Sequence, residues 1–108
     1  MTQTTTPQLV ATSRSQARIS VLDVRNPDEF AAGHIPGAKL IPLPQLPHRM
    51  EDVKHGHRVY VVCESGSRAT QAAQHLALRG YDAQPMAGGM SAWRSAGLPT
   101  VPGMLAMA

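Results

Sequence analysis

The residues best suited to covalent chemistry in this chain are Cys63 and the five that follow it, Glu64-Ser65-Gly66-Ser67-Arg68. Cys63 is the only cysteine among the 108 residues. It follows an apolar run at residues 59–62 and precedes a segment of helical periodicity. This order predicts a cysteine at the carboxyl end of a buried strand, on a tight loop against a helix amino terminus. Converging N–H groups would favour the thiolate there and would also hold an anion carried on the sulfur.

The composition of this loop suits the binding of a small anion. Gly66 can adopt a positive φ, which lets backbone N–H groups turn inward. Ser65 and Ser67 are small hydrogen-bond donors, and Arg68 supplies a permanent cation with a two-pronged donor geometry. These features make Cys63 a candidate nucleophile and the loop up to Arg68 a candidate site for an anion carried on its sulfur.

Three functions compete for such a loop. Cys63 could carry a sulfane sulfur as a persulfide, attack a phosphoryl or arsenate group, or be a structural thiol in a binding module. Cysteine-dependent phosphatases use a Cys-x5-Arg loop, whereas four residues separate Cys63 from Arg68. A shorter loop closes to a smaller radius and fits one extra sulfur better than a tetrahedral phosphate. The residue count therefore favours sulfur transfer over phosphoryl transfer.

Alternating strand and helix patterns predict the surroundings of the loop. Strands are expected at residues 19–24, 59–62 and 81–86, with an extended piece at 39–42. Helices are expected over residues 7–13, from Asn26-Pro27 to Gly33, near 44–52, from Ala69 to Gly80, and over 90–96. This alternation predicts an α/β protein with a parallel sheet, whose sites lie at the carboxyl ends of strands. We expect one domain over residues 1–108, with its core at about 7–100 and flexible ends.

Composition argues against several other classes of protein. The net charge of +3 comes from scattered Lys and Arg residues, which favours a solvated surface over a nucleic-acid interface. No apolar run is long enough to span a bilayer, so we expect no membrane association. One cysteine excludes an internal disulfide and a cysteine-cluster metal site, and a free thiol suits the reducing cytoplasm. His55 and His57 are interpreted as a polar turn, and no cofactor or metal is expected.

Other polar residues near the expected site are interpreted as structural. Asp23 and Arg25 should form a buried ion-pair network, with Glu29 as a possible partner of Arg25, because buried charges require partners. His34 should fix its loop by hydrogen bonding to backbone. Trp93 should anchor the last helix in the core.

Several motifs, in their order and spacing, make the chain resemble a single rhodanese domain, a sulfurtransferase module. The matching pieces are Leu22-Asp23-Val24-Arg25, Glu29-Phe30, residues 33–38, Cys63-x-x-Gly66-x-Arg68, Gly88-Gly89-Met90-x-x-Trp93 and residues 97–99. The resemblance implies a parallel five-stranded sheet flanked by helices on both faces, with Cys63 as the persulfide-carrying nucleophile. It also implies that the loop from Glu64 to Arg68 binds the substrate, cradling the sulfur and the anionic group of the donor. The six-residue form of the loop goes with sulfur transfer in this family, and the seven-residue form with phosphatases.

The implied enzyme belongs to the thiosulfate:cyanide sulfurtransferase class. Its donor would be thiosulfate, a persulfide or a polysulfide, and its acceptor a thiol, cyanide or an acceptor protein. The alternative from another class is a non-catalytic sulfur-carrier or sensing module that acts with a protein partner. A phosphatase or arsenate reductase is disfavoured by the short loop.

Glu64 departs from the family pattern, because many members that use thiosulfate carry a basic residue at this position. A carboxylate about 5 Å from the sulfur would repel a dianion by on the order of 3 kcal/mol before salt screening. The sequence therefore predicts that thiosulfate is a poor donor and that a persulfide or polysulfide is preferred.

Overall fold

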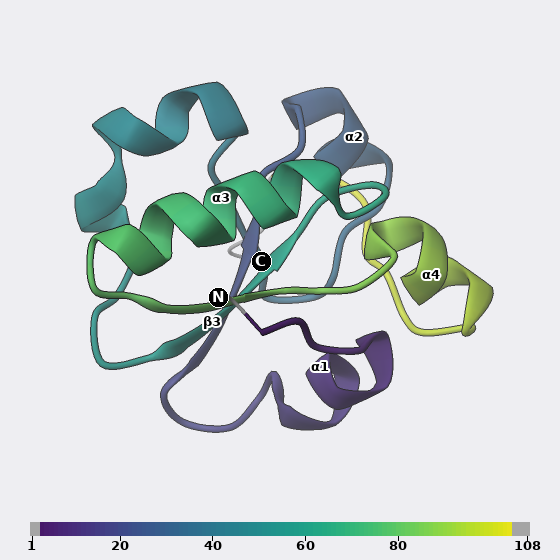
Figure 1. Ribbon diagram of the computed structural model, residues 1–108. Coiled ribbons are helices and arrows are strands. Elements are labelled where there is room, and N and C mark those ends of the chain that lie inside the picture. The colour runs from purple at the N-terminus through teal and green to yellow at the C-terminus, as the bar shows by residue number, and fades with distance from the viewer. Residues whose placement is uncertain (1–2, 105–108) are drawn as a thin grey trace.

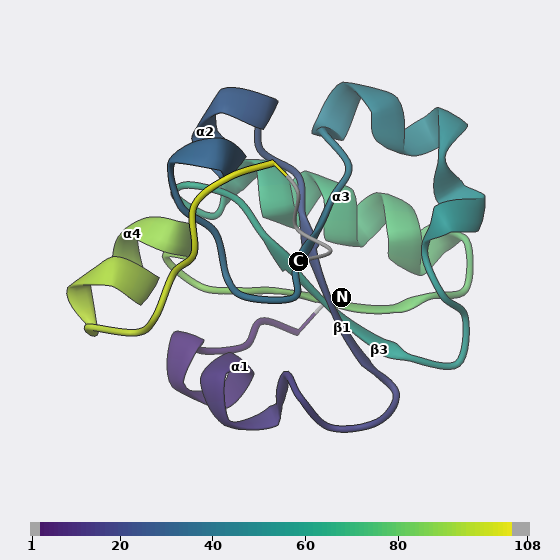
Figure 2. The ribbon, with the colours of Figure 1, turned by 180° about the vertical axis from the view of Figure 1, so that it is seen from behind.

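The computed structural model describes residues 3–104 and contains a parallel sheet with helices on both faces (Figures 1 and 2). The sheet has four strands in the order β2-β1-β3-β4, and each neighbouring pair is parallel. The strands are β1 (Ile19–Asp23), β2 (Lys39–Leu40), β3 (Arg58–Val62) and β4 (Asp82–Pro85). The α/β class and the parallel sheet are confirmed.

The expectation of five strands is wrong for the described residues. Beyond β4 there is only an isolated parallel bridge between Thr5 and Met86. The Thr5 N–H donates to the Pro85 carbonyl at 3.0 Å, and the Ala87 N–H donates to the Thr5 carbonyl at 2.8 Å. A longer strand cannot form because the next two residues start helix α1 (Pro7–Ser13), with Thr6 as its N-cap and proline in its first turn. The end of the chain at residues 105–108, where we expected a flexible tail, lies outside the described residues.

In the described part of the chain, the sheet is covered by four α-helices: α1, α2 (Pro27–Ala32), α3 (Ser67–Leu78) and α4 (Gly89–Ser95). The predicted start of α2 is confirmed, since the Glu29 carboxylate accepts a hydrogen bond from the Asn26 N–H at 2.9 Å. None of the helices within residues 3–104 is long and apolar enough to cross a membrane.

The predicted α-helix near residues 44–52 is instead two 3₁₀ helices, η1 (Leu43–His48) and η2 (Met50–Asp52). The hydrogen bonds here run from a residue to the third one before it, as in Arg49 N–H to the Leu46 carbonyl at 3.0 Å. Pro47 lies inside η1 and lacks the N–H that an α-helix would need at that point. The apolar side chains of this segment still contribute to the core, as the fully buried Leu46 shows.

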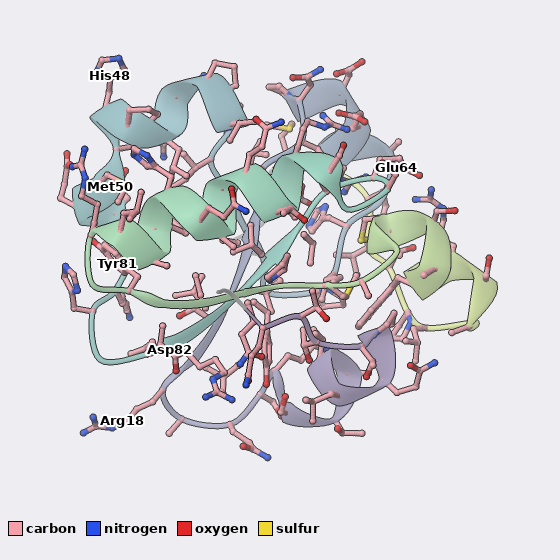
Figure 3. The ribbon with its side chains drawn as sticks, in the orientation of Figure 1. Arg18, His48, Met50, Glu64, Tyr81 and Asp82 are labelled. Carbon is pink, nitrogen blue, oxygen red and sulfur yellow. The ribbon has the colours of Figure 1, made fainter. Side chains whose placement is uncertain are left out.

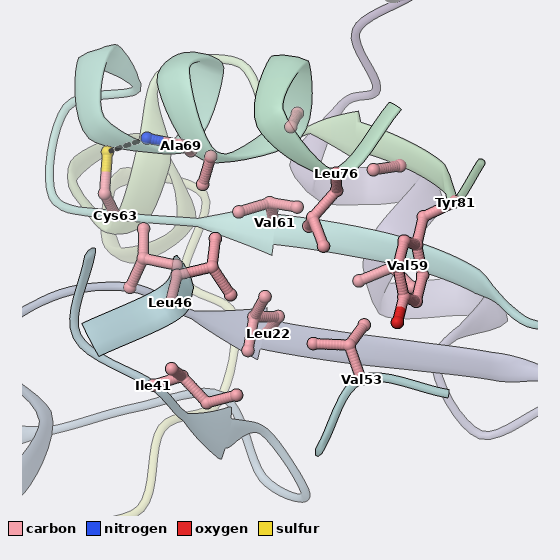
Figure 4. Packing of buried hydrophobic residues seen from close by; sticks show 14 residues of the cluster. Leu22, Ile41, Leu46, Val53, Val59, Val61, Cys63, Ala69, Leu76 and Tyr81 are labelled. Carbon is pink, nitrogen blue, oxygen red and sulfur yellow. Dashed lines mark hydrogen bonds between the residues drawn. The ribbon is translucent and has the colours of Figure 1, made fainter. Parts of the chain in front are cut away.

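Side chains that alternate along β3 supply both halves of the core. Val59 and Val61 pack with α3 and Leu46 on one face, as Figure 4 shows. Tyr60 and Val62 pack on the other face with residues of α1, α2 and α4. Alanines on the buried side of α3, at positions 69, 72 and 73, carry little bulk and let the helix lie close to the strands. Trp93 is fully buried, which confirms its predicted role as a core anchor.

The topology brings the ends of β1 and β3 together. The chain leaves β1 toward β2 on one side and leaves β3 through α3 toward β4 on the other. The two connections therefore run in opposite directions from the neighbouring strands β1 and β3. In parallel sheets, the crevice at such a point is the usual place for a ligand-binding or active site. Pairing continues past the strands, since the Val24 N–H donates to the Val62 carbonyl at 2.9 Å. Arg25 and Cys63 follow directly at this edge.

Candidate active site

The sulfur of Cys63 is held by two backbone N–H groups. Sγ accepts from the Gly66 nitrogen at 3.0 Å and from the Ala69 nitrogen at 3.3 Å. Figure 4 shows Sγ directed at the first turn of α3, with the bond to Ala69 drawn. The residue is fully buried. Donors of this kind, aided by the helix dipole, stabilise negative charge on the sulfur without any side-chain cation. We call Cys63, the loop 64–66 and the first turn of α3 the sulfur cradle.

Gly66 makes this geometry accessible to the backbone. It is the N-cap residue of α3 and has a φ of 114°, which confirms the predicted positive φ. A glycine cap offers no side chain to the free N–H groups of the first turn. Cys63 Sγ takes that place by accepting from Ala69, the third residue of the helix. The cysteine therefore caps α3.

Helix α4 holds the cysteine loop in place through backbone hydrogen bonds. The Met90 N–H donates to the Cys63 carbonyl at 2.8 Å, and the Ser91 N–H donates to the Glu64 carbonyl at 3.0 Å. A Cβ on Gly89 would lie 2.5 Å from both carbonyl oxygens. No side chain fits there, so the glycine is required by close approach of two backbones. Gly88-Gly89 belongs to one of the matching motifs of the sequence, but nothing in the sequence showed that these glycines support the cysteine loop.

Arg68 is paired with a carboxylate of α2. Its two terminal nitrogens donate to Glu29 Oε1 at 2.7 Å and Oε2 at 3.0 Å. The hydrogen bonds from Arg68 lower the pKa of Glu29 to about 2, and the bond from Asn26 acts in the same direction. The Arg68 guanidinium, which we expected to bind the substrate, is thus bound to Glu29. The sequence did not suggest this partner for Arg68.

Glu64 joins two further arginines. It lies 3.5 Å from Arg25 Nη1 and forms an ion pair with Arg94 of α4; Figure 3 shows Glu64 at the loop near that helix. Arg25 is also held by Asp23 at 2.8 Å and by the Gly33 carbonyl at 2.9 Å. The buried network of Asp23 and Arg25 is confirmed, but the suggested pairing of Arg25 with Glu29 is wrong. Arg94 was missed, because no local spacing relates it to a residue thirty positions earlier.

Three arginines and three carboxylates thus surround the cradle and balance in charge. The arginines are 25, 68 and 94, and the carboxylates are Asp23, Glu29 and Glu64. We call these six residues the charged rim. Because each cation already has an anionic partner, the backbone N–H groups are the main attraction for an anion at the sulfur. Glu64 is therefore not the free carboxylate on which the predicted repulsion of a dianion was based, because it is paired with Arg94 and contacts Arg25.

A groove of about 410 Å³ opens beside the loop. Its charged lining residues are Arg25, Glu29, Glu64 and Arg94, and the end of α2 with the following glycine forms another wall. Its volume falls within the usual range for small-molecule sites.

The two serines of the loop lie on its outer side. Ser65 and Ser67 are both exposed, and within residues 3–104 the donors to Sγ are backbone groups. Their hydroxyls are therefore not part of the contacts that hold the sulfur in this structure.

Three of the five histidines make contacts that suit a structural role. His34 is buried, its Nδ1 lies 2.9 Å from the Phe30 carbonyl, and its ring stacks on Phe30. His55 stacks on Tyr81, and His57 Nδ1 lies 3.0 Å from the Ser20 hydroxyl. In the described part of the chain, no three His, Cys, Asp or Glu side chains gather where they could hold a metal.

The chain is similar to known proteins in sequence. Residues 6–96 match the model of the rhodanese-like domain. The chain is 37% identical over 84 residues to a sulfurtransferase of Allochromatium vinosum, covering 77% of this chain and 78% of that protein. It is 32% identical over 79 residues to the thiosulfate sulfurtransferase GlpE of Pseudoalteromonas translucida, covering 72% and 75%.

A solved structure shows the same architecture. The rhodanese-related protein of Thermoplasma volcanium superposes with a TM-score of 0.87 at 25% identity, covering 92% of this chain and 97% of that one. The chain spans 61%, 55% and 36% of three further relatives, from Bacillus subtilis, Synechocystis and again Bacillus subtilis. The last of these is a putative sulfur carrier protein, 33% identical over 67 residues.

Proposed function

The chain belongs to the rhodanese-like domain family, and on that premise we propose that it is a sulfurtransferase that carries sulfane sulfur as a persulfide on Cys63. The observation that carries the proposal is the pair of N–H groups, from Gly66 and Ala69, that converge on Sγ. They stabilise the thiolate that attacks and the anionic persulfide that results.

In the first half-reaction, the Cys63 thiolate attacks the outer sulfur of the donor. The new S–S bond forms as the bond between the outer sulfur and the rest of the donor breaks. The bonding electrons leave with the donor, as a thiolate from a persulfide or as sulfite from thiosulfate. No external oxidant or reductant is required, because the sulfane sulfur moves with its oxidation state unchanged.

In the second half-reaction, an acceptor removes the outer sulfur. A thiolate or cyanide attacks it, the S–S bond on Cys63 breaks, and the electrons return to Sγ to restore the thiolate. The products are a new persulfide or thiocyanate. Little proton handling is needed between anionic sulfurs, which agrees with a site that has a buried histidine committed to the backbone rather than to the cysteine.

Phosphoryl transfer is supported less well by the same geometry. A phosphoryl group brings several negative oxygens whose charge must be stabilised, yet all three rim arginines already have carboxylate partners. Cys63 is also fully buried, and one outer sulfur requires less displacement of the loop than a tetrahedral group. Both features support sulfur as the transferred group.

Steady-state kinetics tests this mechanism. With a persulfide donor and cyanide as acceptor, we expect parallel lines in double-reciprocal plots, as for a ping-pong reaction. Cys63→Ser should show no turnover while keeping the wild-type circular dichroism spectrum. Sulfur transfer retained in this variant, or intersecting lines with the wild type, would contradict a Cys63 persulfide intermediate.

A sulfur-carrier role is the second candidate, favoured by the likeness to the putative sulfur carrier protein of Bacillus subtilis. A carrier would form the Cys63 persulfide but discharge it poorly to small acceptors and efficiently to an acceptor protein. Comparing the rates of loading and discharge separates the two roles. We place either role in the cytoplasm, where a free thiol is kept reduced.

A further inference from the structure

We propose that the groove beside the loop binds the carrier part of a zwitterionic organic persulfide, with Arg94 binding its carboxylate. The donor class is an amino-acid or small-peptide persulfide, which has a carboxylate, an ammonium group and a terminal sulfane sulfur. This inference rests on the proposed function, because it names the donor that would deliver sulfur to Cys63.

The groove has the position and the size for such a carrier. Glu64, which lines it, directly follows Cys63 in the chain. Its volume of about 410 Å³ is several times what an inorganic sulfur oxyanion fills, since one water-sized group takes about 30 Å³. A donor whose outer sulfur enters the cradle therefore has room for a carbon skeleton alongside the loop.

The charges of the groove suit a ligand that carries both signs. A dianion bound to Arg94 lies next to the Glu64 carboxylate, and drawing Arg94 away from Glu64 leaves that carboxylate only its 3.5 Å contact with Arg25. A zwitterion can exchange partners instead: its carboxylate accepts from Arg94 while its ammonium group donates to Glu64. No charge is left unpaired in that complex, so the groove discriminates by penalising the dianion as well as by attracting the zwitterion.

Exposure identifies which arginine can change partners. The Arg25 side chain is 2% exposed and is bound to Asp23 and to the Gly33 carbonyl. The Arg94 side chain is 48% exposed and that of Glu64 is 36% exposed, so their ion pair is open to solvent and to ligand. Arg25 is thus a fixed part of the wall, and Arg94 is the specificity residue.

Donor selectivity measured as kcat/KM tests the inference with three probes: cysteine persulfide, ethanethiol persulfide and thiosulfate. Arg94→Gln should lower kcat/KM for cysteine persulfide about tenfold, the size expected for one lost charge-assisted contact. It should change the value for ethanethiol persulfide, which has neither charged group, by less than about twofold. Glu64→Gln should raise kcat/KM for thiosulfate about threefold or more, since it frees the Arg94 guanidinium for the anion and removes a like charge beside it.

Control variants make each outcome decisive. Arg79→Gln removes an exposed arginine at the far end of α3 and should leave all three values unchanged. Arg94→Lys should restore part of the selectivity, because it keeps the charge and loses the fork. Equal effects of Arg94→Gln on the two persulfides, or no effect on either, would overturn the inference. Turnover of ethanethiol persulfide by the wild type reports on the proposed function separately, because that probe does not use the charged groove.

Discussion

The sulfur cradle and the charged rim lie next to each other and are built in opposite ways. In the cradle, Cys63 Sγ is bound by backbone N–H groups of Gly66 and Ala69, and no side chain among residues 3–104 donates a hydrogen bond to it. In the rim, arginine side chains are matched by carboxylate side chains in ion pairs. The cradle is fully buried at its sulfur, whereas the Glu64 and Arg94 side chains of the rim are substantially exposed.

This difference separates two tasks of the site. The donors of the cradle are main-chain groups, so stabilisation of a sulfur anion depends on the path of the main chain. Side-chain ion pairs can exchange partners with a ligand, so selection among donors depends on the rim. Changes to the backbone path should therefore abolish the chemistry, and changes to the rim should alter stability or selectivity while the chemistry remains.

The largest effect is expected from Gly89→Ala, which acts on the backbone of the cradle. The new Cβ would lie 2.5 Å from the Cys63 and Glu64 carbonyl oxygens, and φ is 59°. We expect a loss of about 3 kcal/mol in the free energy of unfolding and at least about a tenfold loss of sulfur transfer, because the loop must shift. Urea unfolding and steady-state assays measure the two quantities.

Gly97→Ala is the matched control for that change. Gly97 also has a positive φ, 72°, but a Cβ there meets nothing within 4 Å. It should cost about 1 kcal/mol in stability through backbone strain and leave sulfur transfer unchanged. Equal losses of activity in the two variants would show that close approach of α4 to the loop does not matter for the chemistry.

A smaller effect is expected from Glu29→Gln, which acts on the rim. At pH 7 the loss of the ion pair to Arg68 should lower the free energy of unfolding by about 1 kcal/mol, because the pair is partly solvated. The folded-state pKa of Glu29 is depressed from 4.5 to about 2, so its contribution is complete above pH 4.5 and is lost as pH falls toward 2. The stability difference between wild type and variant should therefore shrink across that window.

Urea unfolding at several pH values between 7 and 3 measures this difference. Glu51→Gln, an exposed carboxylate outside the rim, serves as the reference and should show little change across the same range. A Glu29→Gln difference that stays constant from pH 7 to pH 3 would contradict the role given to the ion pair. Sulfur transfer in Glu29→Gln should remain within a few-fold of the wild type.

The cradle could be predicted from the sequence better than the rim. The strand, the glycine-bearing loop and the helix follow one another directly in the chain. Their order is therefore enough to predict how Cys63, Gly66 and the start of α3 are arranged. Glu64 pairs with Arg94 of α4, and Arg68 pairs with Glu29 of α2. These partners are 30 and 39 positions apart in the sequence, and no periodic pattern in the sequence relates residues at such separations. The count of five strands came from the resemblance alone, and the helix that starts at Pro7 leaves only Thr5 to pair, with Met86 just beyond β4.

The central claim, that Cys63 carries the transferred sulfur, is tested most directly by intact-mass spectrometry. The protein is incubated with a persulfide donor, freed of excess donor and weighed before and after addition of cyanide. We expect one added sulfur, about 32 Da, on the wild type, none on Cys63→Ala, and loss of the added mass with cyanide. An unmodified wild-type mass with persulfide, polysulfide and thiosulfate alike, or an equal gain on Cys63→Ala, would contradict the account.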